Sequence, residues 1–245
     1  MSRLAKDMGM KTVIICLENP LNGKCKLFTV HKGLLTRSHN IFRSMLRQHP
    51  DVDNVKLQLP HSRAFQLYVV WLYTDVVHVE SLKTSFPSEW ETNDRIWDML
   101  FTAYVLGQEM LDVDFQDAIM DKILEYLTSG VKICRALLLQ LINEAYKKCK
   151  GHDPLRLILT ELAVWGLGDA EFGLLIGEKT LHPASFEDLS KKISERISCK
   201  DSKDPPYLKH IGSCHYHRHW PEFCYKNKLN CEGMNVEPEE IYTPF

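Results

Sequence analysis

The chain contains 245 residues, of which 44% are hydrophobic and 25% are charged, and its formal net charge is -2. This composition supports a sizeable core, and the near balance of charge excludes a basic field of the kind that binds nucleic acid. No apolar run approaches the roughly 20 residues of a membrane helix, and residues 1–11 lack the apolar centre of a secretion signal. Neither nucleic acid nor a membrane is therefore an expected partner.

The first 60 residues predict a small sheet and two short helices. Residues 12–17 are rich in β-branched side chains, which is typical of a buried strand, and residues 24–30 predict a second strand. Residues 31–35 and 39–48 predict the two short helices. Residues 55–59 alternate with period two, as a half-buried strand does.

Apolar side chains at helical spacing dominate the rest of the chain up to residue 200. The predicted helices lie around residues 65–72, 96–107, 115–126, 137–145, 155–165 and 193–197. The polar segment 75–93 predicts a loop, and the charged segment 201–206, which ends in two prolines, predicts a linker. A small sheet followed by a run of helices indicates an α+β protein.

The cysteines indicate a reducing environment. Eight of them are spread over the chain, too few and too scattered for a disulfide scaffold in a protein of this length. Cys16, Cys25 and Cys134 stand in apolar or strand contexts, and we interpret them as small core residues. We therefore expect an intracellular protein of the cytoplasm or nucleus.

Several short segments, in this order and spacing, resemble the BTB/POZ domain. Residues 28–35, FTVHKGLL, are similar to that family's F-x-V-H-K-x-x-L segment, and residues 38–42, SHNIF, to the S-x-x-F start of its next helix. Residues 70–74, VWLYT, resemble the W-L-Y-T that ends the central helix in fungal members. Residues 103–107 and 115–121 are similar to the last helix pair of that fungal group.

The resemblance implies both the domain organisation and the function. It implies a BTB/POZ domain at 1–130, an all-helical extension at 131–200, and a linker with a short irregular Cys/His tail at 201–245. The expected function is that of a non-enzymatic protein–protein interaction module. Such a module self-associates, most simply as a homodimer, and acts as a scaffold or adaptor.

The two short helices carry more apolar surface than we expect them to bury within one small domain. Such an excess near the start of the chain predicts a protein interface. The residues concerned are Leu34, Leu35, Ile41, Phe42, Met45 and Leu46. The alternative is that these side chains only cover the sheet.

The sequence leaves two alternatives to this interaction function. The wider family suggests a substrate adaptor of a cullin-type ubiquitin ligase, which carries a hydrophobic-x-acidic pattern after the second short helix. Here the matching place holds Pro50-Asp51-Val52, with Val52 where the acid belongs, so we expect cullin binding to be weak or absent.

The second alternative is an enzyme, which would need a nucleophile or cofactor motif. The chain has no G-x-S-x-G pattern, and Gly166-Leu167-Gly168 lacks the third glycine of a dinucleotide loop.

Carboxylates cluster at the start of one predicted helix. Asp112, Asp114 and Asp117 can be considered as a cation site. We interpret them instead as residues that cap free amides and complement the helix dipole.

The tail carries the one pattern that points to a metal. Cys214, His217, His219 and Cys224 have the spacing C-x2-H-x-H-x4-C, and zinc favours thiolate and imidazole in closed sets of four. We therefore predict one structural Zn2+, as similar tails of fungal BTB proteins also suggest. In an extended segment His215 points away from the metal, and Cys231 is the substitute if Cys224 is not a ligand. The alternatives are an exposed, unstructured tail and a nucleic-acid finger; the lack of a basic helix after the motif argues against the finger.

Overall fold

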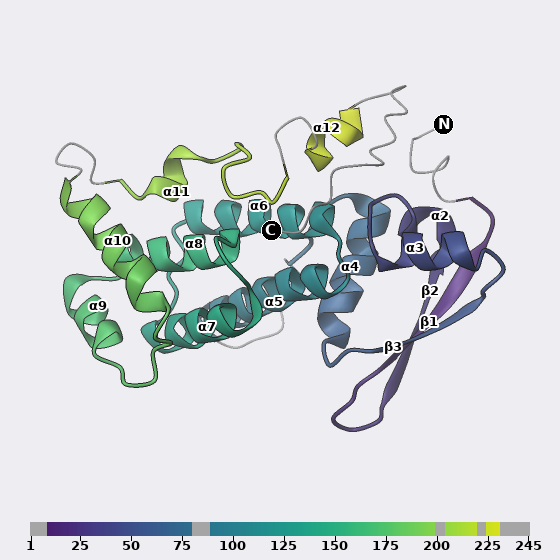
Figure 1. The fold of residues 1–245 in the computed structure, drawn as a ribbon, viewed down its shortest axis with the longest axis horizontal. Helices are drawn as coiled ribbons and strands as arrows, with labels where there is room; N and C mark the ends of the chain where they lie inside the picture. The colour runs from purple at the N-terminus through teal and green to yellow at the C-terminus, as the bar shows by residue number, and fades with distance from the viewer. Residues whose placement is uncertain (1–8, 80–88, 199–203, 220–223, 231–245) are drawn as a thin grey trace.

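The computed structural model describes residues 9–79, 89–198, 204–219 and 224–230 (Figure 1). A small three-stranded sheet lies at one end of the molecule, and the helices extend away from it toward the other end. This arrangement agrees with the predicted α+β class. No helix in these ranges is both long and apolar enough to span a bilayer.

The sheet places β1 (Thr12–Glu18) between β2 (Cys25–His31), which is antiparallel to it, and β3 (Asn54–Gln58), which is parallel. All three predicted strands are confirmed, with bounds that differ by one residue. Val13 and Ile15 are buried, whereas the residues that alternate with them face outward, as the period of two requires. The sheet therefore presents one face to the helices and the other to solvent.

Two short helices, α2 (Lys32–Leu35) and α3 (Ile41–Gln48), follow β2 as predicted. The prediction that six apolar side chains of these helices are in excess and form an interface is wrong for four of them. These four are buried in the chain's own core: Leu34, Leu35, Phe42 and Leu46. Ile41 and Met45 are half-buried and pack against the same core. The reason is that α2 contacts both β2 and α4 (Ser62–Thr74), so longer helices complete a core that the short ones would not fill alone.

Five further helices build the centre of the molecule. α5 (Glu89–Glu109) packs along α6 (Val113–Thr128), and α4 contacts α5. α7 (Arg135–Lys148) packs on α5 and on α8 (Pro154–Glu161), which α10 (Ser185–Ser198) covers. One cluster of buried apolar side chains runs through all of them and into the sheet.

The remaining described helices are short: the π-helical turn η2 (Leu162–Gly166), which continues α8, and α9 (Asp169–Ile176), α11 (Pro206–Lys209) and α12 (Tyr225–Asn230). Each helix predicted from apolar spacing is confirmed. The segment 75–93 was predicted as a loop, but the chain is helical from Glu89 onward, and residues 80–88 lie outside the described residues.

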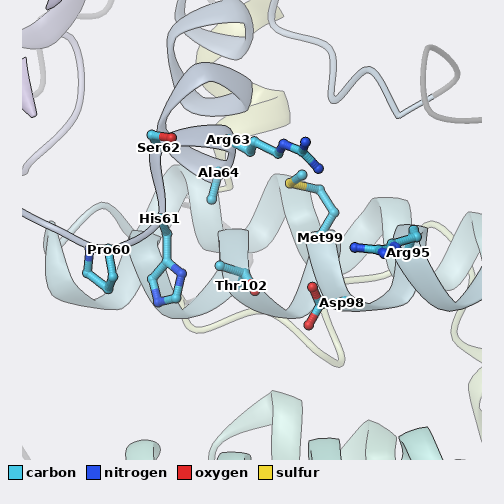
Figure 2. A pocket seen from close by; sticks show the side chains of 9 residues that line it. All are labelled: Pro60, His61, Ser62, Arg63, Ala64, Arg95, Asp98, Met99 and Thr102. Atoms are coloured by element: carbon cyan, nitrogen blue, oxygen red, sulfur yellow. The ribbon is translucent and has the colours of Figure 1, made fainter. Parts of the chain in front are cut away.

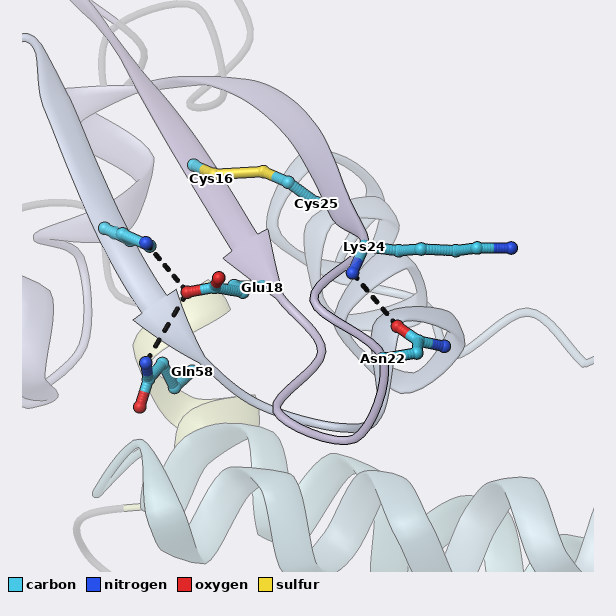
Figure 3. The surroundings of a disulfide bond; sticks show 7 residues. Cys16, Glu18, Asn22, Lys24, Cys25 and Gln58 are labelled. Carbon is cyan, nitrogen blue, oxygen red and sulfur yellow. Dashed lines mark hydrogen bonds and ion pairs between the residues drawn. A yellow bond between two sulfur atoms is a disulfide. The ribbon is translucent and has the colours of Figure 1, made fainter.

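The cysteines of the hairpin depart from the prediction. Cys16 and Cys25 lie on the outer face of the sheet and are joined by a disulfide (Figure 3). The disulfide means that they are not reduced thiols. They are also not core residues, because strand alternation turns Cys16 away from its buried neighbours Ile15 and Leu17. Cys134 is also not a simple core residue, since its half-buried sulfur accepts a hydrogen bond from the backbone at the start of α7.

Asp112 joins the first short helices to α4 and α6. One of its carboxylate oxygens accepts the amide of Phe115 at 3.1 Å, which confirms its interpretation as a helix cap. The other oxygen accepts hydrogen bonds from the Ser38 hydroxyl at 2.6 Å, the Asn40 amide at 3.0 Å and the Tyr68 hydroxyl at 2.9 Å. Complete burial raises the pKa of this carboxyl, and the three donors oppose that shift.

We predict that Asp112→Ala lowers the free energy of unfolding by ~3 kcal/mol, because it leaves buried donors without an acceptor and removes a helix cap. Asp98→Ala, at an exposed aspartate of α5, is the control and should change stability by less than about 0.5 kcal/mol. Urea unfolding followed by circular dichroism measures both. Equal losses for the two variants would contradict the role assigned to Asp112.

Candidate metal centre

The four predicted ligands come together in space. The ligand atoms of Cys214, His217, His219 and Cys224 all lie within 4.8 Å of one another. Three of the residues belong to the loop after α11, and Cys224 immediately precedes α12. Cys231, the predicted substitute, lies outside the described residues.

A tight turn brings the first two ligands to one side. The amide of His217 donates to the carbonyl of Cys214 at 3.1 Å, which closes a four-residue turn. The segment was predicted to be extended, and this part of the prediction is wrong. His215 nevertheless points away from the cluster as expected, because its ring stacks on His210 with centroids 3.8 Å apart.

Both histidines also contact carboxylates of α6. A ring nitrogen of His219, Nδ1, is hydrogen-bonded to Asp117, whose other oxygen accepts the backbone amide of Arg218 at 2.8 Å. The Nε2 atom of His217 lies 3.1 Å from a carboxylate oxygen of Asp121. Asp117 was interpreted as a residue that supports the helix start, and the structure corrects this, because its side chain faces the tail.

The tail is also fixed to α8. Tyr216 is fully buried and donates to Glu161 at 2.5 Å, and burial raises the pKa of its hydroxyl. Arg218 lies 3.5 Å from Asp153, which also accepts the Tyr104 hydroxyl at 3.0 Å. The alternative of an exposed, unstructured tail is therefore wrong for residues 204–219.

The donor set fits zinc. Zinc binds sulfur at about 2.3 Å and imidazole nitrogen at about 2.0–2.1 Å, so tetrahedral ligands are roughly 3.3–3.8 Å apart. The separations of up to 4.8 Å need only a small inward movement. Burial, followed by the neighbouring Cys224, raises the pKa of Cys214 to about 11, so a metal has to displace a proton from this thiol. The Nε2 atom of His219 is buried and has no hydrogen-bond partner among the described residues, so it can accept a metal.

The same residues can be considered as a nucleophilic triad. Cys224, His217 and Asp121 stand in the order of nucleophile, base and orienting acid. The Cys224 sulfur is, however, 3.9 Å from Nδ1 of His217, which is long for proton transfer, and only 3% of Cys224 is exposed. Convergence of a second cysteine and a second histidine favours a metal centre.

A pocket of about 270 Å³ at the start of α4 offers another place to look for catalysis (Figure 2). It is lined by His61, Ser62, Arg95 and Asp98, among others. In Figure 2 the His61 ring points down from the chain, whereas the Ser62 hydroxyl lies above it and is directed sideways and not toward the ring, so they do not form a nucleophile and base pair. The pocket therefore carries no recognisable catalytic arrangement.

Sequence reasoning found the four ligands but not the acidic side chains that the tail contacts. These are Asp117 and Asp121 on α6, and Asp153 and Glu161 at the two ends of α8. The spacing of four residues places Asp117 and Asp121 on one helical face, which was the available signal. Their partners lie about a hundred residues further along the chain, which no local pattern reveals.

Comparisons with models of protein families, with curated proteins and with solved structures gave no significant match.

We predict that Tyr216→Phe lowers the free energy of unfolding by about 1.5–3 kcal/mol, because the hydrogen bond from its hydroxyl goes to a buried carboxylate. Tyr207→Phe is the matched control, since Tyr207 is buried in the same segment and its hydroxyl makes no hydrogen bond among the described residues. Chemical denaturation measures both variants. A smaller effect for Tyr216→Phe than for the control would overturn the assignment.

Proposed function

We propose that the protein is a non-enzymatic interaction module of the BTB/POZ type, whose C-terminal segment is held in place by one structural zinc ion. The observation that carries the zinc assignment is the convergence of two cysteines and two histidines at a site that is packed against α6. Soft sulfur and imidazole ligands select zinc over magnesium and calcium. A complete set of four protein ligands leaves no open position for a substrate, as in structural sites.

The order of elements supports the BTB/POZ assignment. Two antiparallel strands, two short helices, a third strand and a long helix follow one another along the chain, as the resemblance implies. The fungal-type helical extension that the resemblance implies would comprise α7 to α10, and the described part of the Cys/His tail would comprise residues 204–219 and 224–230. This support is one of arrangement and motif order, and it leads us to propose a binding function rather than catalysis.

We propose that self-association uses the outer face of the sheet. Leu27 on β2 is 66% exposed, and Ile14, two positions away across the strand pair, is 39% exposed. β2 is an edge strand, whose outer backbone groups pair with no strand in the described part of the chain. A second copy that pairs antiparallel with β2 would satisfy these groups and place its own outer-face side chains beside Leu27, which makes a two-fold dimer the simplest assembly.

Adaptor function for a cullin is the weaker alternative. The turn between α3 and β3 contains Val52 in the position where an acid is expected, and this side chain is half-buried against the core. An interface there would lack its polar anchor.

The zinc assignment predicts about one zinc ion per chain when the untagged protein is analysed by inductively coupled plasma mass spectrometry. A double change, Cys214→Ser with His217→Ala, should remove the metal because only two ligands remain. His215→Ala is the matched control, since this neighbouring ring stacks on His210 and does not face the cluster. Zinc that is absent from the wild type, or that survives the double change, would contradict the site.

Self-association predicts a dimer of the full chain in light scattering at micromolar concentration. Leu27→Lys should shift the protein toward monomer, because it places a charge at the centre of the proposed contact. Leu174→Lys on α9 is the control, as this leucine is similarly exposed, at 60%. A wild type that is monomeric throughout, or equal behaviour of the two variants, would rule out this surface.

A further inference from the structure

Two carboxylates of α6 lie beneath the metal centre. Asp117 and Asp121 are one helical turn apart and both face the tail. Asp117 is fully buried, is hydrogen-bonded to the His219 ring and accepts a hydrogen bond from the backbone amide of Arg218. Asp121 lies against the His217 ring and accepts hydrogen bonds from the Tyr225 hydroxyl at 2.5 Å and the Lys226 ammonium at 2.8 Å.

The contacts leave one particular nitrogen of each ring for the centre. Asp117 is hydrogen-bonded to Nδ1 of His219, and the opposite atom, Nε2, is buried and has no hydrogen-bond partner in the described part of the chain. His217 is turned the other way. Its Nε2 is 3.1 Å from Asp121, an ion-pair distance without the alignment of a hydrogen bond, and its Nδ1 faces the Cys224 sulfur at 3.9 Å.

A neutral imidazole carries one N–H and one lone pair. When a carboxylate accepts the N–H at one nitrogen, the lone pair is fixed on the other, and that nitrogen is the one able to bind a metal. Outer-shell carboxylates of this kind orient ligating histidines and increase their basicity. For His219, the hydrogen bond to Asp117 therefore leaves Nε2 as the ligand atom. For His217, the carboxylate of Asp121 lies 3.1 Å from Nε2, so Nδ1, which faces the Cys224 sulfur, is the nitrogen on the side of the centre.

We propose, on the basis of the zinc site proposed above, that Asp117 and Asp121 are positioning residues that select the ligand atoms. Asp117 directs His219 to bind through Nε2, and Asp121 directs His217 to bind through Nδ1. The site is consequently built by the tail and α6 together, and isolated tail residues would not reproduce its affinity.

The first test needs no variant. Long-range nitrogen–proton NMR spectra of the zinc-loaded full chain report which ring nitrogen is metal-bound. The expected pattern is Nδ1 for His217 and Nε2 for His219. The same nitrogen bound in both rings would overturn the proposal.

The second test measures zinc affinity by competition with a chromogenic chelator in full-length Asp117→Asn and Asp121→Asn. Each change keeps the shape of the side chain and replaces a carboxylate by a weaker acceptor, so affinity should fall about 10- to 100-fold with the stoichiometry still one at saturation. Glu161→Gln is the control, because Glu161 anchors the same segment through Tyr216 without touching a ligand, and affinity should change less than about twofold.

The outcomes separate the two proposals. A wild type that binds no zinc removes both the metal site and its positioning residues. A wild type that binds one zinc ion with unchanged affinity in both aspartate variants retains the site and overturns the role of Asp117 and Asp121. An equal fall in zinc affinity in Glu161→Gln would show that the effect comes from docking of the tail. That result would also overturn the positioning role of the two aspartates. Substitution with Co2+ gives an independent readout, since its visible absorption bands should shift in the aspartate variants and not in the control.

Discussion

The fold depends on carboxylates that are removed from water. Asp112, Asp117, Asp153 and Glu161 are each 4% exposed or less. A carboxylate in such a place is tolerated only when hydrogen-bond donors or cations come to it. For Asp112 these donors come from the short helices and α4, and they hold the first half of the chain together. For the other three, residues 216–219 of the tail supply donors. The tail thus supplies partners to buried carboxylates of the helices beneath it, beside Lys192 for Glu161 and Tyr104 for Asp153.

The same constraint explains how such a short tail becomes ordered. α11 has four residues and α12 has six, and helices of this length are not stable by themselves. Ordering each residue costs ~1–2 kcal/mol of backbone entropy, which the few buried side chains of the segment offset only in part. Cross-links must supply the rest. Hydrogen bonds to α6 and α8 are one set of cross-links, and a metal held by four tail residues, with an apparent binding free energy of ~10–16 kcal/mol in small zinc domains, would be the other.

The sequence allowed prediction of features that arise from local periodicity or clustering. β-Branched composition identified the first strand and alternation the third, apolar spacing identified the helices, and the grouping of Cys214, His217, His219 and Cys224 identified the ligands. The failures have a common cause, which is that burial depends on partners distant in sequence. The core role of Phe42 requires the helices that complete the core around α2 and α3, and the partner of His219 lies 102 residues away on α6. Cys16 was misjudged because an unbroken apolar run hides the alternation that turns it outward, toward Cys25.

The molecule therefore has one side on which its own chain supplies hydrogen-bond partners to buried carboxylates, and another on which apolar side chains remain exposed. On the α6 and α8 side, each buried carboxylate meets a donor, and the tail closes the surface over them. On the outer face of the sheet, Leu27 and Ile14 remain exposed beside a disulfide that ties β1 to β2. Among the described residues, the polar contacts of the tail go to helices and not to the strands. This separation supports the proposed module, in which a zinc ion would stabilise the scaffold and the sheet would contact a partner, because a rigid surface loses less conformational freedom on binding.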